Sequence, residues 1–404
     1  MRVPDGWRVE KLGGISTAVT SGSRDWAQFY AESGSKFLRM TNLSRDGIYL
    51  KLDDLKYVDV KGDSADGKRT ALISGDILIS ITAELGKIGW VPEEFGEAFI
   101  NQHTALVRIN QKLAHSKFIA YLLSSGKMNA VINQLNDAGA KAGLNLPTIK
   151  SLPILLPSIS EQQKIAQILS TWDKAIDKLE ALIAAKQKRK KALMQQLLTG
   201  KMRFSKFGQE WKQIRLKKII NEERSRNKDR VITRVLSVTN HSGFVLPKDQ
   251  FSRQVASDDL SNYKIVRKGE FGYNPSRINV GSFARLDDYD HGVLSPMYVI
   301  FSINDKVLDS DFFINWMKSH EAKQKITSST QGSVRDSVGF DALGSFLITL
   351  PPIAEQQKIA LVLTTADKEI TIHQKQFAAL KQQKKALMQQ LLTGKKRVQT
   401  ELEV

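Results

Sequence analysis

Apolar residues recur at alternating intervals of four and three positions along two long stretches of the chain, residues 161–201 and 355–395. This spacing is typical of a coiled-coil seam, and the lysines and the histidine that fall on the seam are polar positions that can fix its register. The predicted seam residues are Ile165, Leu169, Trp172, Ile176, Leu179, Ile183, Lys186, Lys190, Leu193 and Leu197, followed in the second stretch by Ile359, Leu363, Ala366, Ile370, His373, Phe377, Leu380, Lys384, Leu387 and Leu391.

Proline precedes each stretch and glycine closes it, the usual punctuation of a helix. Pro157 and Gly200 bound the first stretch, and Pro351 and Gly394 bound the second. The pattern therefore predicts two helices of about 38 residues, each roughly 57 Å long at 1.5 Å per residue.

The two helices are copies of one another. Shifted by 194 positions they align without gaps, 25 of 41 residues are identical, and both end on KKALMQQLLTGK. An apolar stripe of this length must be buried against a packing partner, and the other helix is the nearest candidate. We therefore expect the two helices to pack antiparallel in a closed, pseudo-twofold arrangement.

The helices divide the chain into a first block, 1–160, a central helix, 161–203, a second block, 204–354, and a distal helix with a short tail, 355–404. Short apolar runs in both blocks predict strands, and each block has one helical stretch, which together indicate an α+β class with two similar globular domains. The predicted strands are 71–80, 105–109, 231–238 and 298–303, and the predicted helical stretches are 116–135 and 311–326.

Charge points to a polyanionic partner. The 404 residues include 60 Lys and Arg against 42 Asp and Glu, a formal charge of +18. The surplus per residue is largest on the helices, since 161–203 holds 10 basic and 4 acidic residues. Clustered cations release counterions from a phosphate backbone, which favours nucleic acid as the partner, although a basic solvated surface is also compatible with these numbers.

The sequence lacks the usual signatures of an enzyme. No Ser or Thr follows any Gly-Lys pair, so a phosphate loop is absent, and no G-x-S-x-G or metal-type histidine pair occurs. There is no cysteine, which excludes disulfides, and no apolar run approaches 18 residues. We expect a non-catalytic, cytoplasmic protein without a membrane segment.

Two differing blocks, each followed by a near-identical helix that opens on EQQKIA and closes on KKALMQQLLTGK, resemble the specificity subunit of a type I restriction–modification system. The block openings GWRVEKLG and EWKQIRLKK, and the stretches FINQHTALVRI and YNPSRINVGS, are also similar to that family. The resemblance implies two target-recognition domains that each read one half of a bipartite, asymmetric site on double-stranded DNA. It also implies helices that set the gap and dock two methyltransferase subunits, with a restriction/translocase subunit joining in some complexes.

The family's chemistry would lie elsewhere in the complex. The resemblance implies adenine methylation with S-adenosylmethionine on the partner subunits and cleavage driven by ATP and Mg on a motor subunit, with no cofactor and no catalytic residue in this chain. The stretches that open the helices are expected to meet the methyltransferases, although they could equally be helix starts with an acid near the dipole. These residues are Glu161, Gln162, Gln163, Lys164, Glu355, Gln356, Gln357 and Lys358.

Side chains able to bond base edges, placed in predicted loops, are candidates for DNA contact. Arg277 ranks first, because it lies in a Gly-, Asn- and Pro-rich loop between strands. The candidates in the first block are Arg24, Arg39, Asn42, Lys68, Arg69, Lys87 and Lys141, and those in the second are Arg224, Arg226, Asn240, Asn274, Arg277, Asn279 and Arg335.

Three other interpretations stay open at this point. One is the recognition subunit of a methylation-only complex, and another is a coiled-coil scaffold whose domains bind proteins. The third is an autonomous nuclease in which Asp76 or the Asp258-Asp259 pair holds a metal.

Overall fold

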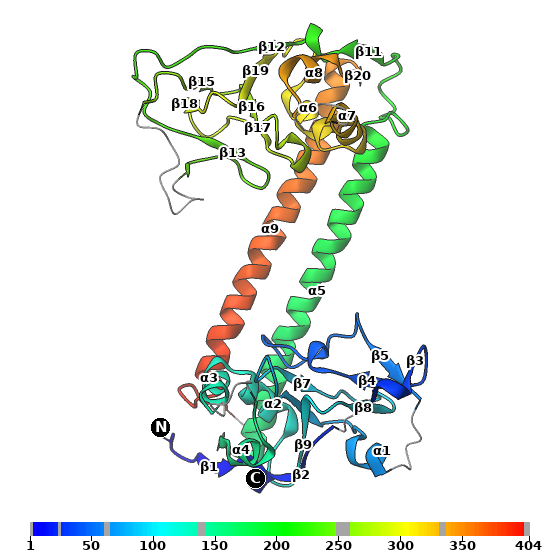
Figure 1. Ribbon diagram of the computed structural model, residues 1–404, viewed down its shortest axis with the longest axis vertical. Helices are drawn as coiled ribbons and strands as arrows, with labels where there is room; N and C mark the ends of the chain where they lie inside the picture. The colour runs from blue at the N-terminus through cyan, green and yellow to red at the C-terminus, as the bar shows by residue number, and fades with distance from the viewer. Residues whose placement is uncertain are drawn as a thin grey trace. The chain divides into compact units, whose positions relative to one another are not determined.

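A computed structural model describes residues 3–22, 26–59, 65–135, 143–247, 259–330 and 337–399. The chain divides into two compact units, and each combines one globular block with segments of both long helices (Figure 1). Unit 1 comprises residues 1–180 and 376–404, and unit 2 comprises residues 181–375.

Unit 1 is built around a four-stranded antiparallel sheet of order β2-β9-β6-β7, beside a smaller sheet of order β3-β5-β4-β8 and a two-stranded pair, β1-β10. Its strands are β1 (Arg8–Lys11), β2 (Ser16–Ser21), β3 (Tyr30–Ala31), β4 (Ser35–Leu38), β5 (Lys56–Val58), β6 (Ile77–Ser80), β7 (Ile88–Trp90), β8 (Ala98–Ile100), β9 (Thr104–Ile109) and β10 (Pro153–Leu156). Its helices within the block are the 3-10 turns η1 (Leu12–Ile15), η2 (Trp26–Phe29) and η3 (Met40–Asn42), with α1 (Ala65–Thr70), α2 (Ser116–Ser124), α3 (Gly126–Gln134) and α4 (Leu146–Ser151).

Unit 2 repeats this plan around a four-stranded sheet of order β12-β19-β16-β17, with the pairs β11-β20, β13-β14 and β15-β18. Its strands are β11 (Lys212–Arg215), β12 (Ile220–Glu222), β13 (Ser237–Thr239), β14 (Gly243–Val245), β15 (Lys264–Arg267), β16 (Phe271–Tyr273), β17 (Phe283–Arg285), β18 (His291–Leu294), β19 (Val299–Ile303) and β20 (Leu347–Leu350). Its helices within the block are η4 (Leu216–Lys218), η6 (Ile278–Val280), α6 (Ser310–Met317), α7 (His320–Thr330) and α8 (Phe340–Ser345).

The main sheets of the two units therefore have the same strand order, and the strand that enters each block pairs with the strand that leaves it. The predicted α+β class and the likeness of the two blocks are confirmed. Among the predicted strands, 105–109 and 298–303 correspond closely to β9 and β19, whereas only the end of 71–80 is strand. The prediction of a strand over 231–238 was wrong for most of its length, because Val231 is 80% exposed and the regular strand begins at Ser237.

Each predicted helical stretch is two helices. In unit 1, α2 ends at Ser124, and the extended backbone of Ser125 starts α3, with its hydroxyl accepting from the amide of Met128 at 3.3 Å. In unit 2, α6 and α7 are separated at Lys318 and Ser319, where the Ser319 hydroxyl accepts from the next helix's amide at 3.2 Å. A serine that caps the following turn ends one helix and begins the next, and apolar periodicity alone does not reveal the break.

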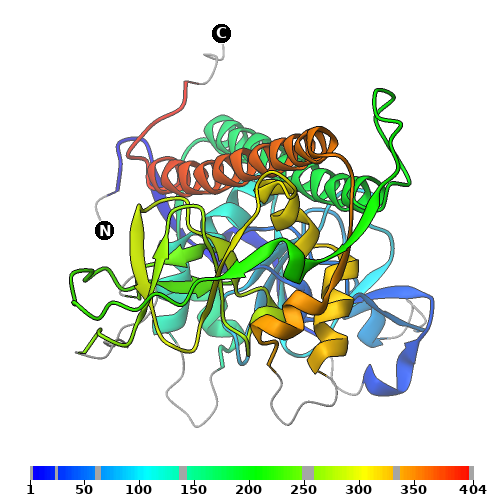
Figure 2. The same ribbon diagram turned by 90° about the horizontal axis from the view of Figure 1, so that it is seen from above.

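The long helices are α5 (Ile159–Leu197) and α9 (Ile353–Leu391), each of 39 residues. The segments of the two helices lie side by side within each unit (Figures 1 and 2). Every predicted seam residue is buried or half-buried, which confirms the seam. Gly200 and Gly394 follow the helices with φ of +70° and +69°, a left-handed conformation that glycine adopts without strain.

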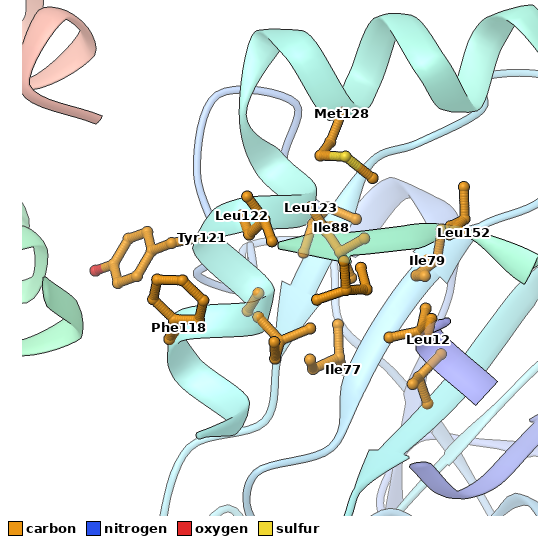
Figure 3. Packing of buried hydrophobic residues seen from close by; sticks show 14 of the residues in the cluster. Leu12, Ile77, Ile79, Ile88, Phe118, Tyr121, Leu122, Leu123, Met128 and Leu152 are labelled. Carbon is orange, nitrogen blue, oxygen red and sulfur yellow. The ribbon is translucent and has the colours of Figure 1, made fainter. Parts of the chain in front are cut away.

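The sheet of unit 1 is covered on both faces, which explains why all four residues of β6 are buried. Ile77 and Ile79 face a cluster formed with α2 and the helix ends, whereas Leu78 faces a second cluster with Leu38 and Ile100. Figure 3 shows the first cluster, in which aliphatic side chains fill the centre and Tyr121 of α2 lies at the margin with its ring directed away from them.

Candidate nucleic-acid interface and the joints that carry it

The glutamate that opens each repeat is buried and binds an arginine that follows the other long helix. In unit 1, Glu161 accepts two hydrogen bonds from the Arg397 guanidinium, both at 2.8 Å. In unit 2, Glu355 accepts from the Arg203 guanidinium at 3.0 and 2.8 Å and from the Trp211 indole at 3.2 Å. Such two-pronged arginine–carboxylate bonds fix geometry as well as energy, so each pair ties one helix start to the other helix's end.

The glutamine after it joins the helix to the globular block through backbone groups. In unit 1, the Gln162 amide donates to the Pro157 carbonyl at 2.9 Å and accepts from the His115 backbone amide at 2.8 Å. In unit 2, Gln356 makes the same bonds, to the Pro351 carbonyl and from the Asp309 amide, both at 2.9 Å. We call each set of glutamate, glutamine and arginine contacts a helix joint.

The EQQK stretches thus divide into two classes of side chain. Glu161, Gln162, Glu355 and Gln356 are at most 2% exposed and form the helix joints, so they are not at the surface of this chain. The following residues, Gln163, Lys164, Gln357 and Lys358, are exposed. Among the EQQK side chains, only the exposed ones are available for contact with a partner subunit.

Ion pairs occupy polar positions of the seam and repeat from one unit to the other. In unit 1, Lys384 of α9 pairs with Asp173 of α5, and both side chains are nearly buried. In unit 2, Lys190 of α5 contacts both carboxylate oxygens of Asp367 of α9 at 2.6 Å. Lys190 corresponds to Lys384 and Asp173 to Asp367 at the 194-residue shift, so each unit has the same pair with the helices exchanged. Two contacts in each unit give the direction of the helices: Lys186 pairs with Glu369 and Lys190 with Asp367 in unit 2, and Glu161 pairs with Arg397 and Asp173 with Lys384 in unit 1. Positions farther along α5 therefore lie beside earlier positions of the α9 segment, and the packing within each unit is antiparallel.

The two ion pairs differ in the side chain that the globular block contributes beside them. In unit 1, the hydroxyl of Tyr121 donates to Asp173 at 2.6 Å, and the Lys384 ammonium lies 5.5 Å from the centre of the Tyr121 ring. Burial, and then the charge of Asp173, raise the pKa of Tyr121 far above its ordinary value, so the phenol stays a donor. In unit 2 the equivalent residue is Asn315, whose side-chain oxygen is buried without a partner.

The loop after β16 in unit 2 is closed by its own backbone hydrogen bonds and carries several of the predicted DNA contacts. The segment Asn274–Ser282 closes on itself, with the Asn274 amide donating to the Ser282 carbonyl at 3.2 Å and the Arg277 amide donating to the Asn274 carbonyl at 3.0 Å. Ile278 anchors the loop in the core, whereas Arg277 and Asn279 are exposed.

The β13–β14 turn lies beside this loop. A Cβ added at Gly281 would lie 3.5 Å from the Cβ of Asn240, which is exposed at the tip of the turn. The structure thus brings Asn240 next to the loop that carries Arg277 and Asn279. Asn274 is half-buried, and its side-chain oxygen accepts from the Ser276 amide at 3.0 Å, which leaves it at the base of the loop.

The other candidates of unit 2, Arg224 and Arg226, follow strand β12. The Arg224 side chain is 79% exposed and is held by Glu222, whose hydrogen bond raises the pKa of Arg224 above its usual value. Arg226 donates to the Asn262 carbonyl at 2.9 Å. Both guanidinium groups are oriented by neighbours and reach the surface, as a contact to DNA requires.

In unit 1, two of the predicted contacts are used within the fold. Asn42 is 1% exposed, and its side chain accepts from the Arg39 amide and donates to the Lys51 carbonyl. The Arg39 guanidinium donates to Asp54 at 2.8 Å and lowers the pKa of that carboxyl through the hydrogen bond.

Three further candidates of unit 1 are closer to the surface. Lys68 and Arg69 are exposed on α1, and Arg69 donates to the Ser21 carbonyl at the end of β2 at 3.0 Å. Lys87 is half-buried and pairs with Glu84 in the β6–β7 turn.

Arg24, Lys141 and Arg335 lie outside the described residues, as does Asp258 of the nuclease interpretation. Asp76 is fully buried, and both of its carboxylate oxygens accept hydrogen bonds from Arg108 at 2.8 and 2.7 Å. Among the described residues, no group of three or more His, Asp or Glu could hold a metal ion. No helix in the described ranges has the length and apolar character that crossing a membrane requires.

Sequence reasoning missed the arginines of the helix joints and the tyrosine at the seam. Arg203 and Arg397 lie beyond the last identical glycine but still obey the 194-residue shift, which is the signal that could have found them. Tyr121 has no such signal, because its equivalent is an asparagine.

Comparisons with known proteins agree with this architecture. The family described as "Type I restriction modification DNA specificity domain" matches residues 4–188 and 271–382, more than half of the chain. The chain is 27% identical to a candidate specificity subunit of the type I restriction enzyme MjaX from Methanocaldococcus jannaschii, over 98% of this chain and 95% of that one. It is 22% identical, with the same coverage, to the type I restriction enzyme MjaVIII specificity subunit of that organism.

Solved structures give the same result for the fold. The crystal structure of the type I restriction-modification S subunit from M. genitalium superposes with a TM-score of 0.62 over 97% of this chain and 98% of that one, at 13% identity. With a family match over most of its length and this fold, the chain belongs to the type I restriction–modification specificity subunits.

Proposed function

We propose that each unit reads one half of a bipartite, asymmetric sequence on double-stranded DNA, and that the helices set the gap between the half-sites. The observation that carries this proposal is the hydrogen-bonded loop of unit 2 and the turn beside it, where Arg277, Asn279 and Asn240 are exposed together. Arginine bonds guanine and asparagine bonds adenine through two hydrogen bonds in the major groove, so these side chains suit sequence reading. A preformed loop also reduces the entropy lost on binding.

We further propose that the helices dock two methyltransferase subunits. Exposed residues near the ends of the repeats are identical in both copies, although packing within the chain does not require it. In unit 1 they are Gln163, Lys164, Lys385, Ala386, Gln389 and Gln390, and in unit 2 they are Gln357, Lys358, Lys191, Ala192, Gln195 and Gln196.

The middle of the helices has diverged at exposed positions. Lys178 in α5 corresponds to Ile372 in α9, and Leu182 corresponds to Gln376. Identity at exposed positions is concentrated near the ends, with Lys174, Ala184 and Ala185 and their equivalents as exceptions in the middle, and this concentration supports a second copy of the same partner on the second unit. On this proposal the chain is not itself an enzyme and acts in the cytoplasm. S-adenosylmethionine would bind the methyltransferases, and ATP with Mg would bind a restriction subunit where one is present.

The test of DNA reading is to co-express the chain with its methyltransferase in a methylation-free host and map adenine methylation across the genome. A two-part asymmetric motif that appears only with this chain supports the proposal. If the two proteins co-purify and no motif appears, the scaffold interpretation replaces it.

Docking is tested by the mass of the purified complex. Gln195→Glu with Gln196→Glu should remove the methyltransferase of unit 2, leaving one subunit of two. The matched control is Gln382→Glu with Gln383→Glu, two exposed glutamines of α9 outside the identical ends, which should retain both subunits. Equal loss in the two variants would contradict the docking surface.

A further inference from the structure

The outer strand of the main sheet in each unit begins beside an exposed lysine that comes from a different element in the two units. In unit 1 the element is α4, where Lys150 packs against η1, and in unit 2 it is η4, where Lys217 packs against α8. We call the place where these two elements pack together the crossing. The crossings of the two units are otherwise alike, because the Leu12 amide donates to the Leu152 carbonyl and the Leu216 amide to the Phe346 carbonyl, both at 2.9 Å.

A glycine faces the lysine in both crossings. A Cβ added at Gly13 would lie 2.9 Å from the Cβ of Lys150, and one added at Gly344 would lie 3.2 Å from the Cβ of Lys217. The close approach therefore requires a small residue on one element and admits a long side chain on the other. The chain has exchanged glycine and lysine between the elements and kept one ammonium group at the crossing in each unit.

Packing explains the glycine but does not explain the charge. An aliphatic stem covers the crossing, and a methionine or leucine would supply it as well as lysine does. Both lysines are exposed, so their ammonium groups lie in solvent. The lysine lies on α4 in unit 1 and on η4 in unit 2, yet each unit keeps one ammonium group at this place. This retention of the positive charge points to an anionic partner at both places.

Basic residues also lie at the far end of the same strands. In unit 1 the groove of about 850 Å³ beside β2 is lined by Lys11 and Lys150 at one end, and Arg69 bonds the carbonyl of the strand's last residue, Ser21. The groove also contains Glu10, which pairs with Arg8 at 3.5 Å.

In unit 2, basic residues likewise lie at both ends of the equivalent strand. Lys217 and Lys218 precede β12, and Arg224 and Arg226 follow it. In both sheets this strand lies at the edge of the strand order, next to one neighbour. Cations therefore lie at both ends of one edge strand in each unit, and in unit 2 Arg224 also pairs with Glu222 of that strand.

We propose that this strand edge in each unit holds the phosphate backbone of DNA, with Lys150 and Lys217 as equivalent phosphate contacts. The inference rests on the proposed function, since the same molecule whose bases are read must pass along the unit. Cations at both ends of an edge strand suit a polyanion that runs past it, and Lys68, Arg69, Arg224 and Arg226 are already among the residues predicted to touch DNA. Such contacts add affinity and orientation without sequence preference.

The experiment measures binding of the assembled methyltransferase complex to DNA as a function of salt concentration. Lys150→Met together with Lys217→Met keeps the aliphatic stems and removes two charges. The slope of log affinity against log salt should fall by about two, because each phosphate contact contributes about one. Affinity should fall equally for DNA with and without the recognised motif, and the methylated motif should stay unchanged.

Two further variants make the result specific. Lys112→Met with Lys306→Met is the matched control, since these exposed lysines occupy equivalent turns of the two units and should leave the slope unchanged. Gly13→Lys with Lys150→Gly gives unit 1 the arrangement of unit 2 and should retain the wild-type slope.

An unchanged slope in the Lys150 and Lys217 variant overturns the inference and leaves the proposed function intact, provided the motif persists. Loss of the methyltransferase from that variant also overturns it, because the lysines would then contact protein. Absence of DNA binding by the wild-type complex would refute the proposed function as well.

Discussion

The ion pair between Lys384 and Asp173 predicts a large and local loss of stability when its cation is removed. The two side chains are only 8% and 12% exposed, so Lys384→Met leaves the Asp173 carboxylate buried with Tyr121 as its remaining strong donor. Breaking a buried pair costs about 3–5 kcal/mol. Because the 2.6 Å bond from Tyr121 persists, we expect a loss near the lower limit, about 3 kcal/mol.

The equivalent pair of unit 2 is the internal control. The Asp367 side chain is 42% exposed, so water can solvate the carboxylate after Lys190→Met, and the expected loss is about 1 kcal/mol or less. The two substitutions remove a lysine from equivalent ion pairs, which differ in burial and in the Tyr121 hydroxyl that bonds the carboxylate only in unit 1.

Hydrogen exchange of the intact chain, followed by mass spectrometry, measures the two losses separately. Amides of α2 and of the end of α9 should exchange about a hundredfold faster in Lys384→Met, whereas those of the end of α5 should change about fivefold or less in Lys190→Met. Replacing Asp173 and Lys384 together by leucine should recover most of the protection, because no uncompensated charge remains. Equal acceleration in the two single variants would refute the argument from burial.

Three other predictions follow from single sites. Burial, together with Asp173 and Glu180, raises the pKa of Asp177, so its ionised form costs stability at neutral pH; Asp177→Asn should stabilise the chain at pH 7. That gain in stability should vanish as the pH falls through the raised pKa of Asp177. Thermal unfolding of the wild type and the variant at a series of pH values measures the gain. Arg277→Ala should relax one base of one half-site by about 1–3 kcal/mol, visible as a degenerate position in the methylation motif. Gly394→Ala should lower the melting temperature more than Gly200→Ala, because both have positive φ but only a Cβ at Gly394 would lie 2.5 Å from Pro4.

The seam and the helix ends were predictable from the sequence because they depend on local rules. Ile165, Leu169 and Leu363 follow the heptad spacing, and the glycines that end the helices follow the rule for left-handed closing residues. The break at Ser125 depends on a hydroxyl that caps the next turn, and the apolar spacing continues through it. The apolar spacing alone therefore predicts one helix in a stretch that forms two.

Candidate sites were harder to predict, because a side chain's availability depends on distant partners. Asn42 has the residue type of a base reader, yet its amide is taken up by Arg39 and Lys51 within a buried turn. Arg277 and Arg39 have the same chemistry in the sequence, and only the fold separates an exposed loop from a paired guanidinium. Lys150 and Lys217 do not align with each other, so no sequence repeat could have related them.

The contacts of the helix joints explain how near-identical helices can carry globular blocks of different sequence. Gln162 and Gln356 accept from the backbone amides of His115 and Asp309, groups that are present whatever the side chain. The joint therefore requires little of the block's sequence beyond the local fold and, in unit 2, Trp211, whose indole donates to Glu355. Exchange of residues 204–354 for the second block of another family member should keep both joints and the docked methyltransferases. The methylation motif should then change in one half only, whereas a change in both halves would mean that the units do not read DNA independently.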